Sequence, residues 1–319
     1  MLYKNLLRVI SILVLLPASM GMAQASGNSR WGAGYFPNVE LTTQDGKTVH
    51  FFDDLLKGKA VVIDLIYTHC VDSCPLETAR LAQVQQKLGD RVGKDVFFYS
   101  ITIDPKRDTP EVLKAYAEKY HVGPGWLFLT GKQDDIDLIS KKLGLYSPPT
   151  ATSSDGHAPG LVIGNQAQGQ WMRASATDNA GFLAATIGNF MPLGTARRAG
   201  PMLSYSEAPH IKFDKGNYLF HTRCAACHTI GHGDKIGPDL LGVTGVRDRA
   251  WLLRMIQIPD KVLAEGDPVA TALFEKYKQV QMPNLRLTDD ETSVLVDFLQ
   301  SKQQTADNAA ASKAQPVAP

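Results

Sequence analysis

The chain has 319 residues, with 33 Lys and Arg, 32 Asp and Glu, and a formal net charge of +1. Its 44% hydrophobic and 20% charged content is ordinary for a globular protein and excludes a disordered or fibrous one. The near-zero net charge gives no general reason to expect nucleic-acid binding. The length exceeds one typical hydrophobic core, so two domains are expected.

The N-terminal 25 residues have the pattern of a secretory signal peptide. Lys4 and Arg8 supply the positive charge, residues 9–16 form an apolar run, and Ala23-Gln24-Ala25 matches a cleavage site. The alternative is an uncleaved membrane anchor, but the apolar run is well short of the roughly 20 residues that span a bilayer. We therefore expect export and cleavage after Ala25.

Composition divides the rest of the chain. Residues 196–205 are rich in Gly, Pro and Arg without apolar periodicity, and are predicted to be a linker. Residues 303–319 lack large aliphatic and aromatic side chains and are predicted to be a disordered tail. The predicted domains are therefore 31–195 and 206–302.

The first domain is predicted to be α/β. An Asp45-Gly46 turn predicts a hairpin over 38–52. Apolar runs rich in β-branched and aromatic residues predict buried strands, and helical spacing predicts helices between them. The strands are expected at 59–67, 96–103 and 126–130, the helices at 75–88, from 110, at 134–143 and at 179–190, and a closing hairpin at 161–172. This alternation, with hairpins at both ends, indicates a mixed sheet flanked by helices.

Four cysteines are too few for a disulfide scaffold, and they fall into two close pairs. Cys70 and Cys74 lie where the first buried strand gives way to its helix. A helix N-terminus lowers the pKa of a thiol, so this pair is expected to be reactive. It can form a disulfide or share a soft metal, and thiolates select Cu(I). A purely structural disulfide is the alternative.

Three segments of this domain resemble the Sco/SenC family. They are Thr68-His69-Cys70-Val71-Asp72-Ser73-Cys74-Pro75, the stretch 101–110 (ITIDPKRDTP), and 126–131 (WLFLTG). The resemblance implies a thioredoxin-like protein at the outer face of the inner membrane. It also implies copper binding by Cys70, Cys74 and a distant histidine. Asp155-Gly156-His157 precedes the strand at 161–163, so His157 is the matching ligand, whereas His50, His69 and His121 have no such support.

The second domain contains Cys224-Ala225-Ala226-Cys227-His228, a C-x-x-C-H sequence that predicts covalent attachment of one haem c. His228 would be one axial ligand of the iron. The segment Ile236-Gly237-Pro238-Asp239-Leu240 resembles class I cytochromes c, an all-α fold in which this proline carbonyl accepts the free ring N–H of the histidine. A disulfide or a zinc knuckle is the alternative for this pair.

The second axial ligand is predicted to be Met282, which lies in a loop before Pro283 and the expected terminal helix 289–300. A thioether ligand raises the reduction potential relative to two histidines. Met255 lies in an expected helix, 249–256, and is predicted to be core filler. His221 and His232 are the alternative ligands.

Together these features favour a periplasmic copper-binding redox protein with a covalent haem. The resemblance implies copper delivery to, or redox maturation of, the copper site of a respiratory oxidase, whose subunit would be the copper recipient. A thiol–disulfide oxidoreductase acting through Cys70 and Cys74 is the enzymatic alternative, and a plain electron-transfer cytochrome is the third. We expect redox partner proteins, no nucleic acid, and no evident small-molecule substrate.

Overall fold

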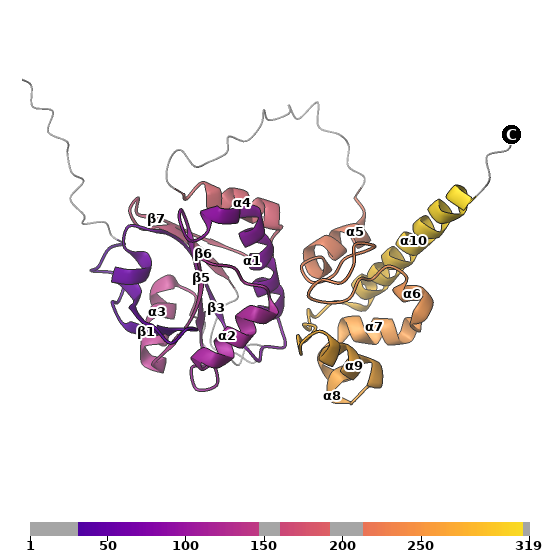
Figure 1. Cartoon of the computed structure of the whole chain (residues 1–319), viewed down its shortest axis with the longest axis horizontal. Helices are drawn as coiled ribbons and strands as arrows, with labels where there is room; N and C mark the ends of the chain where they lie inside the picture. The colour runs from indigo at the N-terminus through magenta and orange to yellow at the C-terminus, as the bar shows by residue number, and fades with distance from the viewer. Residues whose placement is uncertain (1–30, 147–159, 192–212, 315–319) are drawn as a thin grey trace, which may run out of the picture.

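The computed structural model describes residues 31–146, 160–191 and 213–314. These residues form an α/β region followed by a helical region, seen side by side in Figure 1. The predicted thioredoxin-like mixed sheet and the helical C-terminal region are therefore confirmed. The predicted signal peptide, linker and His157 lie outside the described residues.

The α/β region is built on a seven-stranded sheet in the order β2-β1-β5-β4-β3-β6-β7. The strands are β1 (Glu40–Thr43), β2 (Thr48–His50), β3 (Ala60–Ile66), β4 (Phe97–Thr102), β5 (Trp126–Gly131), β6 (Leu161–Asn165) and β7 (Gln170–Ala174). The central strands β3, β4 and β5 are parallel, and the outer pairs are antiparallel. Ile63 of β3 pairs with Tyr99 of β4 on one side and Val162 of β6 on the other.

Both faces of the sheet are covered, because alternate residues of β3 enter two different cores. Val62 and Ile66 pack with α1 (Cys74–Leu88), α2 (Pro110–Lys119) and α4 (Ala180–Gly188). Val61 and Ile63 pack with the π-helical turn Phe51–Leu56 and with α3 (Gln133–Leu143) on the other face. In Figure 1, α1 and α2 lie on the side of the sheet that faces the helical region.

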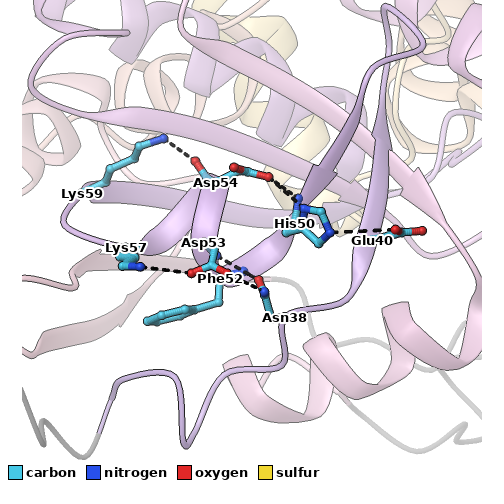
Figure 2. A network of polar contacts seen from close by, with 8 residues as sticks. All are labelled: Asn38, Glu40, His50, Phe52, Asp53, Asp54, Lys57 and Lys59. Carbon is cyan, nitrogen blue, oxygen red and sulfur yellow. Dashed lines mark hydrogen bonds and ion pairs between the residues drawn. The ribbon is translucent and has the colours of Figure 1, made fainter.

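A polar network holds the start of the turn Phe51–Leu56 (Figure 2). The side-chain carbonyl of Asn38 accepts hydrogen bonds from the backbone N–H groups of Phe52 and Asp53, at 3.2 and 2.9 Å. The His50 ring lies 3.2 Å from Asp54 and 3.8 Å from Glu40. His50 therefore belongs to a polar surface network at the β2 edge of the sheet, away from the cysteines that follow β3.

The helical region is assembled around its last helix. Its elements are α5 (Lys215–Leu219), the π-helical turn Phe220–Cys224, α6 (Val243–Val246), α7 (Arg249–Gln257), α8 (Pro259–Ala264), α9 (Pro268–Lys276) and α10 (Asp289–Ala314). Leu219 and Phe220 pack on Leu295, Phe298 and Leu299 of α10. Gly216 permits this close crossing, since a Cβ there would lie 2.6 Å from the Cβ of Phe298.

The expected disordered tail is wrong for residues 303–314, because α10 continues to Ala314. The segment has no apolar stripe, and this absence led to the prediction. It does have several alanines, the strongest helix formers, and it extends a helix that is already nucleated. The helix can therefore propagate from residue 302 to Ala314 without forming a new helical nucleus.

Candidate functional site

The first candidate site is the loop between β3 and α1. Strand β3 ends at Ile66, and α1 begins at Cys74 with Pro75 in its first turn, where a missing N–H costs nothing. The loop turns back through a hydrogen bond from the Cys70 N–H to the Tyr67 carbonyl, at 3.2 Å. This turn brings the two thiols into hydrogen-bond contact, and both residues are buried, at 5% exposure for Cys70 and none for Cys74.

The two thiols have opposite acidities. The hydrogen bond with Cys74 lowers the pKa of Cys70 to about 7, with a further contribution from Tyr67, even though burial acts in the other direction. The same bond, together with burial, raises the pKa of Cys74 well above its usual range. At neutral pH, the site therefore pairs a substantially ionised thiolate with a protonated thiol, the combination that thiol exchange uses.

Asp108 anchors this loop to the next strand. Its buried carboxylate accepts hydrogen bonds from the Thr68 N–H at 3.1 Å and from the Thr68 hydroxyl at 2.6 Å. The Thr102 hydroxyl at the end of β4 donates to the same carboxylate at 2.5 Å. The two sequence motifs around Thr68 and Asp108 are thus one structural unit, because the second fixes the start of the loop that carries Cys70.

His69 is held by the same second motif. Its Nε2 lies 2.9 Å from Nη1 of Arg107 and 3.5 Å from the carboxylate of Asp104. These partners place the His69 ring in a polar cluster at the surface. The structure brings Cys70 and Cys74 together as the sequence predicted, whereas His157, the predicted third ligand, lies outside the described residues.

The second candidate site is a cavity of about 400 Å³ in the helical region. Cys224, Cys227 and His228 line it on one side. The His228 Nδ1 donates to the Pro238 carbonyl oxygen at 2.9 Å, which leaves Nε2 free to bind a metal. Burial lowers the pKa of His228, so the ring is neutral at pH 7. Gly237 allows the close approach, because a Cβ there would lie 2.8 Å from Cε1 of His228.

Two methionines line this cavity, Met282 and Met255. Met282 is the predicted axial ligand, and Met255, which the sequence predicts to be core filler, also lies in the cavity wall. Helical spacing alone could not reveal this, because the apolar face of α7 lines the cavity with Leu252, Met255 and Ile256 while Ile256 also packs against the core of the helical region. The alternative ligands His221 and His232 are absent from the lining residues.

The donor set of this cavity fits a haem c. Two thiols adjoin a neutral imidazole, two thioethers are available, and the rest of the wall is predominantly apolar, with side chains such as Leu252, Ile256 and Leu295. Although Cys224 and Cys227 keep some exposure through the cavity, desolvation raises their pKa values to about 12 and about 11. They remain protonated at neutral pH, unlike Cys70, and are poor candidates for reversible thiol chemistry.

The two sites share a wall. A second, polar cavity of about 210 Å³ is lined by Cys70 and His69 from the α/β region and by residues 279–281 from the helical region. Phe274, Val280 and Gln281 line both cavities. One layer of residues therefore separates the Cys70 thiol from the cavity that contains His228.

The sequence reading missed the residues that join the two regions. Hydrogen bonds and an ion pair cross the junction, and they are made by Arg80, Gln83, Asp72, Asn284 and Arg286. No sequence pattern predicts this contact, because each is an ordinary polar residue at a helix or loop position, and Asp72 occupies a variable position of the cysteine motif. A buried arginine in an amphipathic helix is recognisable only once its partner surface is known.

Two absences apply to the described residues only. Within residues 31–146, 160–191 and 213–314, no three His, Cys, Asp or Glu side chains are gathered as a metal site would require. In the same ranges, no helix has the length and apolar character needed to cross a membrane.

Comparison with known proteins matches each region to a different family model. Residues 32–168 match the SCO1/SenC family model and residues 213–303 match the cytochrome c model. A putative copper-binding protein of Stutzerimonas stutzeri is 32% identical over 120 residues, which are 37% of this chain and 57% of that protein. Protein SCO2, mitochondrial, of Saccharomyces cerevisiae is 37% identical over 106 residues, which are 33% of this chain and 34% of that protein. The chain thus spans between about a third and somewhat over half of these relatives' lengths.

Solved structures match each region separately. A SCO1/SenC family lipoprotein from Bacillus anthracis is 27% identical, covering 49% of this chain and 94% of that one, with a TM-score of 0.42. The cytochrome c domain of the pp3183 protein from Pseudomonas putida is 44% identical, covering 32% of this chain and 99% of that one, with a TM-score of 0.29.

Proposed function

Since the chain joins a SCO1/SenC region, residues 32–168, to a cytochrome c region, residues 213–303, we propose that it is a periplasmic copper-binding redox protein with one covalent haem c. Its role would be to deliver copper to, or to maintain the redox state of, the copper site of a respiratory oxidase. The oxidase subunit that receives copper would be its main partner.

The observation that carries this proposal is the buried Cys70–Cys74 pair. Two adjacent sulfurs at a strand-to-helix turn form a soft donor set suited to Cu(I), with Cys70 largely ionised and Cys74 releasing its proton to solvent as the metal binds. His157 would be the third ligand, and an imidazole also accommodates Cu(II). The name of the Stutzerimonas relative, a putative copper-binding protein, supports the same metal.

In the second region, Cys224 and Cys227 would hold the haem covalently, and His228 and Met282 would be its axial ligands. The haem supplies a carrier of one electron at a time. The Pro238 carbonyl orients His228 through the hydrogen bond to Nδ1. The wall of this cavity is predominantly apolar, and Phe274 and Val280, which line both cavities, would lie between the haem and the bound copper.

A thiol–disulfide oxidoreductase is the second candidate, favoured by the low pKa of Cys70. The Cys70 thiolate would attack a partner disulfide, forming a mixed disulfide and releasing one partner thiolate. The Cys74 thiol would then lose its proton and displace the second partner thiolate, leaving a Cys70–Cys74 disulfide. The reaction transfers two electrons to the partner and needs no His157.

Copper titration of the reduced, haem-loaded full chain tests the proposal. We expect one copper ion per chain in the wild type, loss of binding in Cys70→Ser and in Cys74→Ser, and weakened binding in His157→Ala. His50→Ala is the matched control, because His50 lies in a separate surface network. No copper in the wild type, or unchanged binding in Cys70→Ser, would overturn copper delivery.

The second candidate gives a different pattern. Disulfide reductase activity that is lost in Cys70→Ser and retained in His157→Ala would favour the oxidoreductase. The optical spectrum of the haem, recorded during the copper titration, reports whether the two sites exchange electrons. Export is tested by fractionation, with the N-terminus of the mature protein determined by mass spectrometry.

A further inference from the structure

The face of the α/β region that carries Cys70 is covered by the cytochrome c region. Part of the contact is polar and comes from α1, the helix that begins at Cys74. Arg80, at 3% exposure, donates from Nη2 to the backbone carbonyls of His221 and Thr222 at 3.0 and 3.1 Å. Gln83, one turn further, donates from Nε2 to the carbonyl of Ala225 at 2.9 Å. Both side chains therefore bind the backbone of residues 221–225, which contain Cys224 and precede Cys227.

A second part of the contact reaches the loop between Cys70 and Cys74. The Asn284 N–H donates to the carbonyl oxygen of Val71 at 2.8 Å, and Arg286 pairs with Asp72 at 3.1 Å. Asn284 lies two residues after Met282. The loop that holds the predicted axial ligand is thus bonded directly to the loop that holds the thiols.

The apolar part of the contact is continuous with the first region's core. Ala226, with no exposure, and Ile236, at 7%, belong to the same buried cluster as Leu76 and Tyr120. Residues 279–281 complete the wall of the cavity into which Cys70 opens. In this arrangement, a large partner cannot approach Cys70 from that side.

We propose that the cytochrome c region is a removable cover over the Cys70–Cys74 site. The copper recipient and the chain's own cytochrome c region would then compete for the same face of the α/β region. This inference rests on the proposed function only for the identity of the competitor. Departure of the cover would expose Ala226 and Ile236 and break the hydrogen bonds of Arg80 and Gln83 and the exposed Asp72–Arg286 ion pair. Partly polar interfaces between domains of one chain resemble those of transient complexes, so a partner that offers equivalent contacts would displace it.

The test is the rate at which iodoacetamide alkylates Cys70 in the reduced, haem-loaded full chain, followed by peptide mass spectrometry. Gln83→Glu places a carboxylate against the Ala225 carbonyl and should weaken the contact. Gln86→Glu is the matched control, since it makes the same change at an exposed position on the same helix. We expect alkylation to be about three-fold faster in Gln83→Glu, the size of effect that one surface interaction produces, and unchanged in Gln86→Glu.

A charge exchange gives an independent arm. Asp72→Arg and Arg286→Asp each place like charges together and should accelerate alkylation, and the double variant should restore the wild-type rate. Alkylation rates measured across pH separate the accessibility of Cys70 from its acidity. A change in the pKa of Cys70 moves the midpoint of the rate–pH curve, whereas a change in the cover moves the plateau that the rate reaches at high pH.

If the plateau rates of Gln83→Glu and of both single charge variants equal the wild-type rate, the cytochrome c region does not act as a removable cover. That result would not affect the proposal of copper binding. Conversely, failure of copper titration would overturn the proposed function and leave the alkylation result standing.

Discussion

The hydroxyl of Thr68 donates to the carboxylate of Asp108 across a distance of 2.6 Å, although 40 residues separate them in the chain. Asp108 has no exposure to solvent and also accepts from the Thr68 N–H and the Thr102 hydroxyl. One carboxylate therefore ties the end of β4 to the loop that presents Cys70.

Asp108→Ala should lower the free energy of unfolding by about 3 kcal/mol, because it removes several charge-assisted hydrogen bonds and leaves buried donors unpaired. Denaturant unfolding measures the change. Asp104→Ala is the control, because Asp104 is partly exposed and its ion pairs should contribute less than about 1 kcal/mol. Equal effects of the two substitutions would show that Asp108 does not anchor the loop.

The acidity of Cys70 should depend on Cys74. In the reduced wild type, alkylation of Cys70 should rise with pH about a midpoint near 7, because the thiolate is the nucleophile. Cys74→Ala removes the hydrogen bond that stabilises this thiolate, so the midpoint should move to higher pH. Cys74→Ser retains a donor and should move it less. A wild-type midpoint at the ordinary value of a free cysteine, about 8.5, would contradict this account.

Met282 should ligate the haem iron, whereas Met255 should only line the cavity. Met282→Ala should abolish the sulfur-to-iron charge-transfer band of the oxidised haem, and Met282→His should lower the reduction potential. Met255→Ala should retain the band, with at most a small change in potential. The reverse pattern would assign the axial position to Met255.

Two buried carboxyls should make the stability of the α/β region depend on pH. Burial raises the pKa of Glu77 to about 8 and that of Asp64 to about 7, and Asp64 also raises the pKa of Glu77. Both values lie above those of the unfolded chain, so the native state binds more protons. Stability is therefore greatest below the unfolded pKa values and declines as pH rises through the folded ones, with a slope of up to about 1.4 kcal/mol per pH unit for each group.

Glu77→Gln should remove one of these titrations and flatten the decline in unfolding free energy above about pH 5. Glu118→Gln is the control, because Glu118 lies on the exposed face of α2. Denaturant unfolding at a series of pH values provides the measurement. An identical slope in Glu77→Gln and wild type would mean that Glu77 is ionised in the native protein.

The sequence by itself determined the two fold classes, the two cysteine pairs and their different settings, and the position of His228 before Pro238. These are local features, because buried strands, helix starts and C-x-x-C-H spacing are legible within a few consecutive residues. The prediction of the tail was wrong because composition indicates which segments can form a core, and not how far an established helix propagates.

Only the tertiary structure decided what lies between the two sites. Arg80, Gln83 and Asn284 each donate a hydrogen bond to a backbone carbonyl that lies more than a hundred residues away in the chain. Such contacts depend on how separately folded surfaces fit, and no periodicity encodes that fit. The same reason explains Asp108 and Met255, whose partners are gathered only when strands and helices pack. The positions of the two cysteine pairs were therefore predictable from the sequence, and the adjacency of the two sites was not.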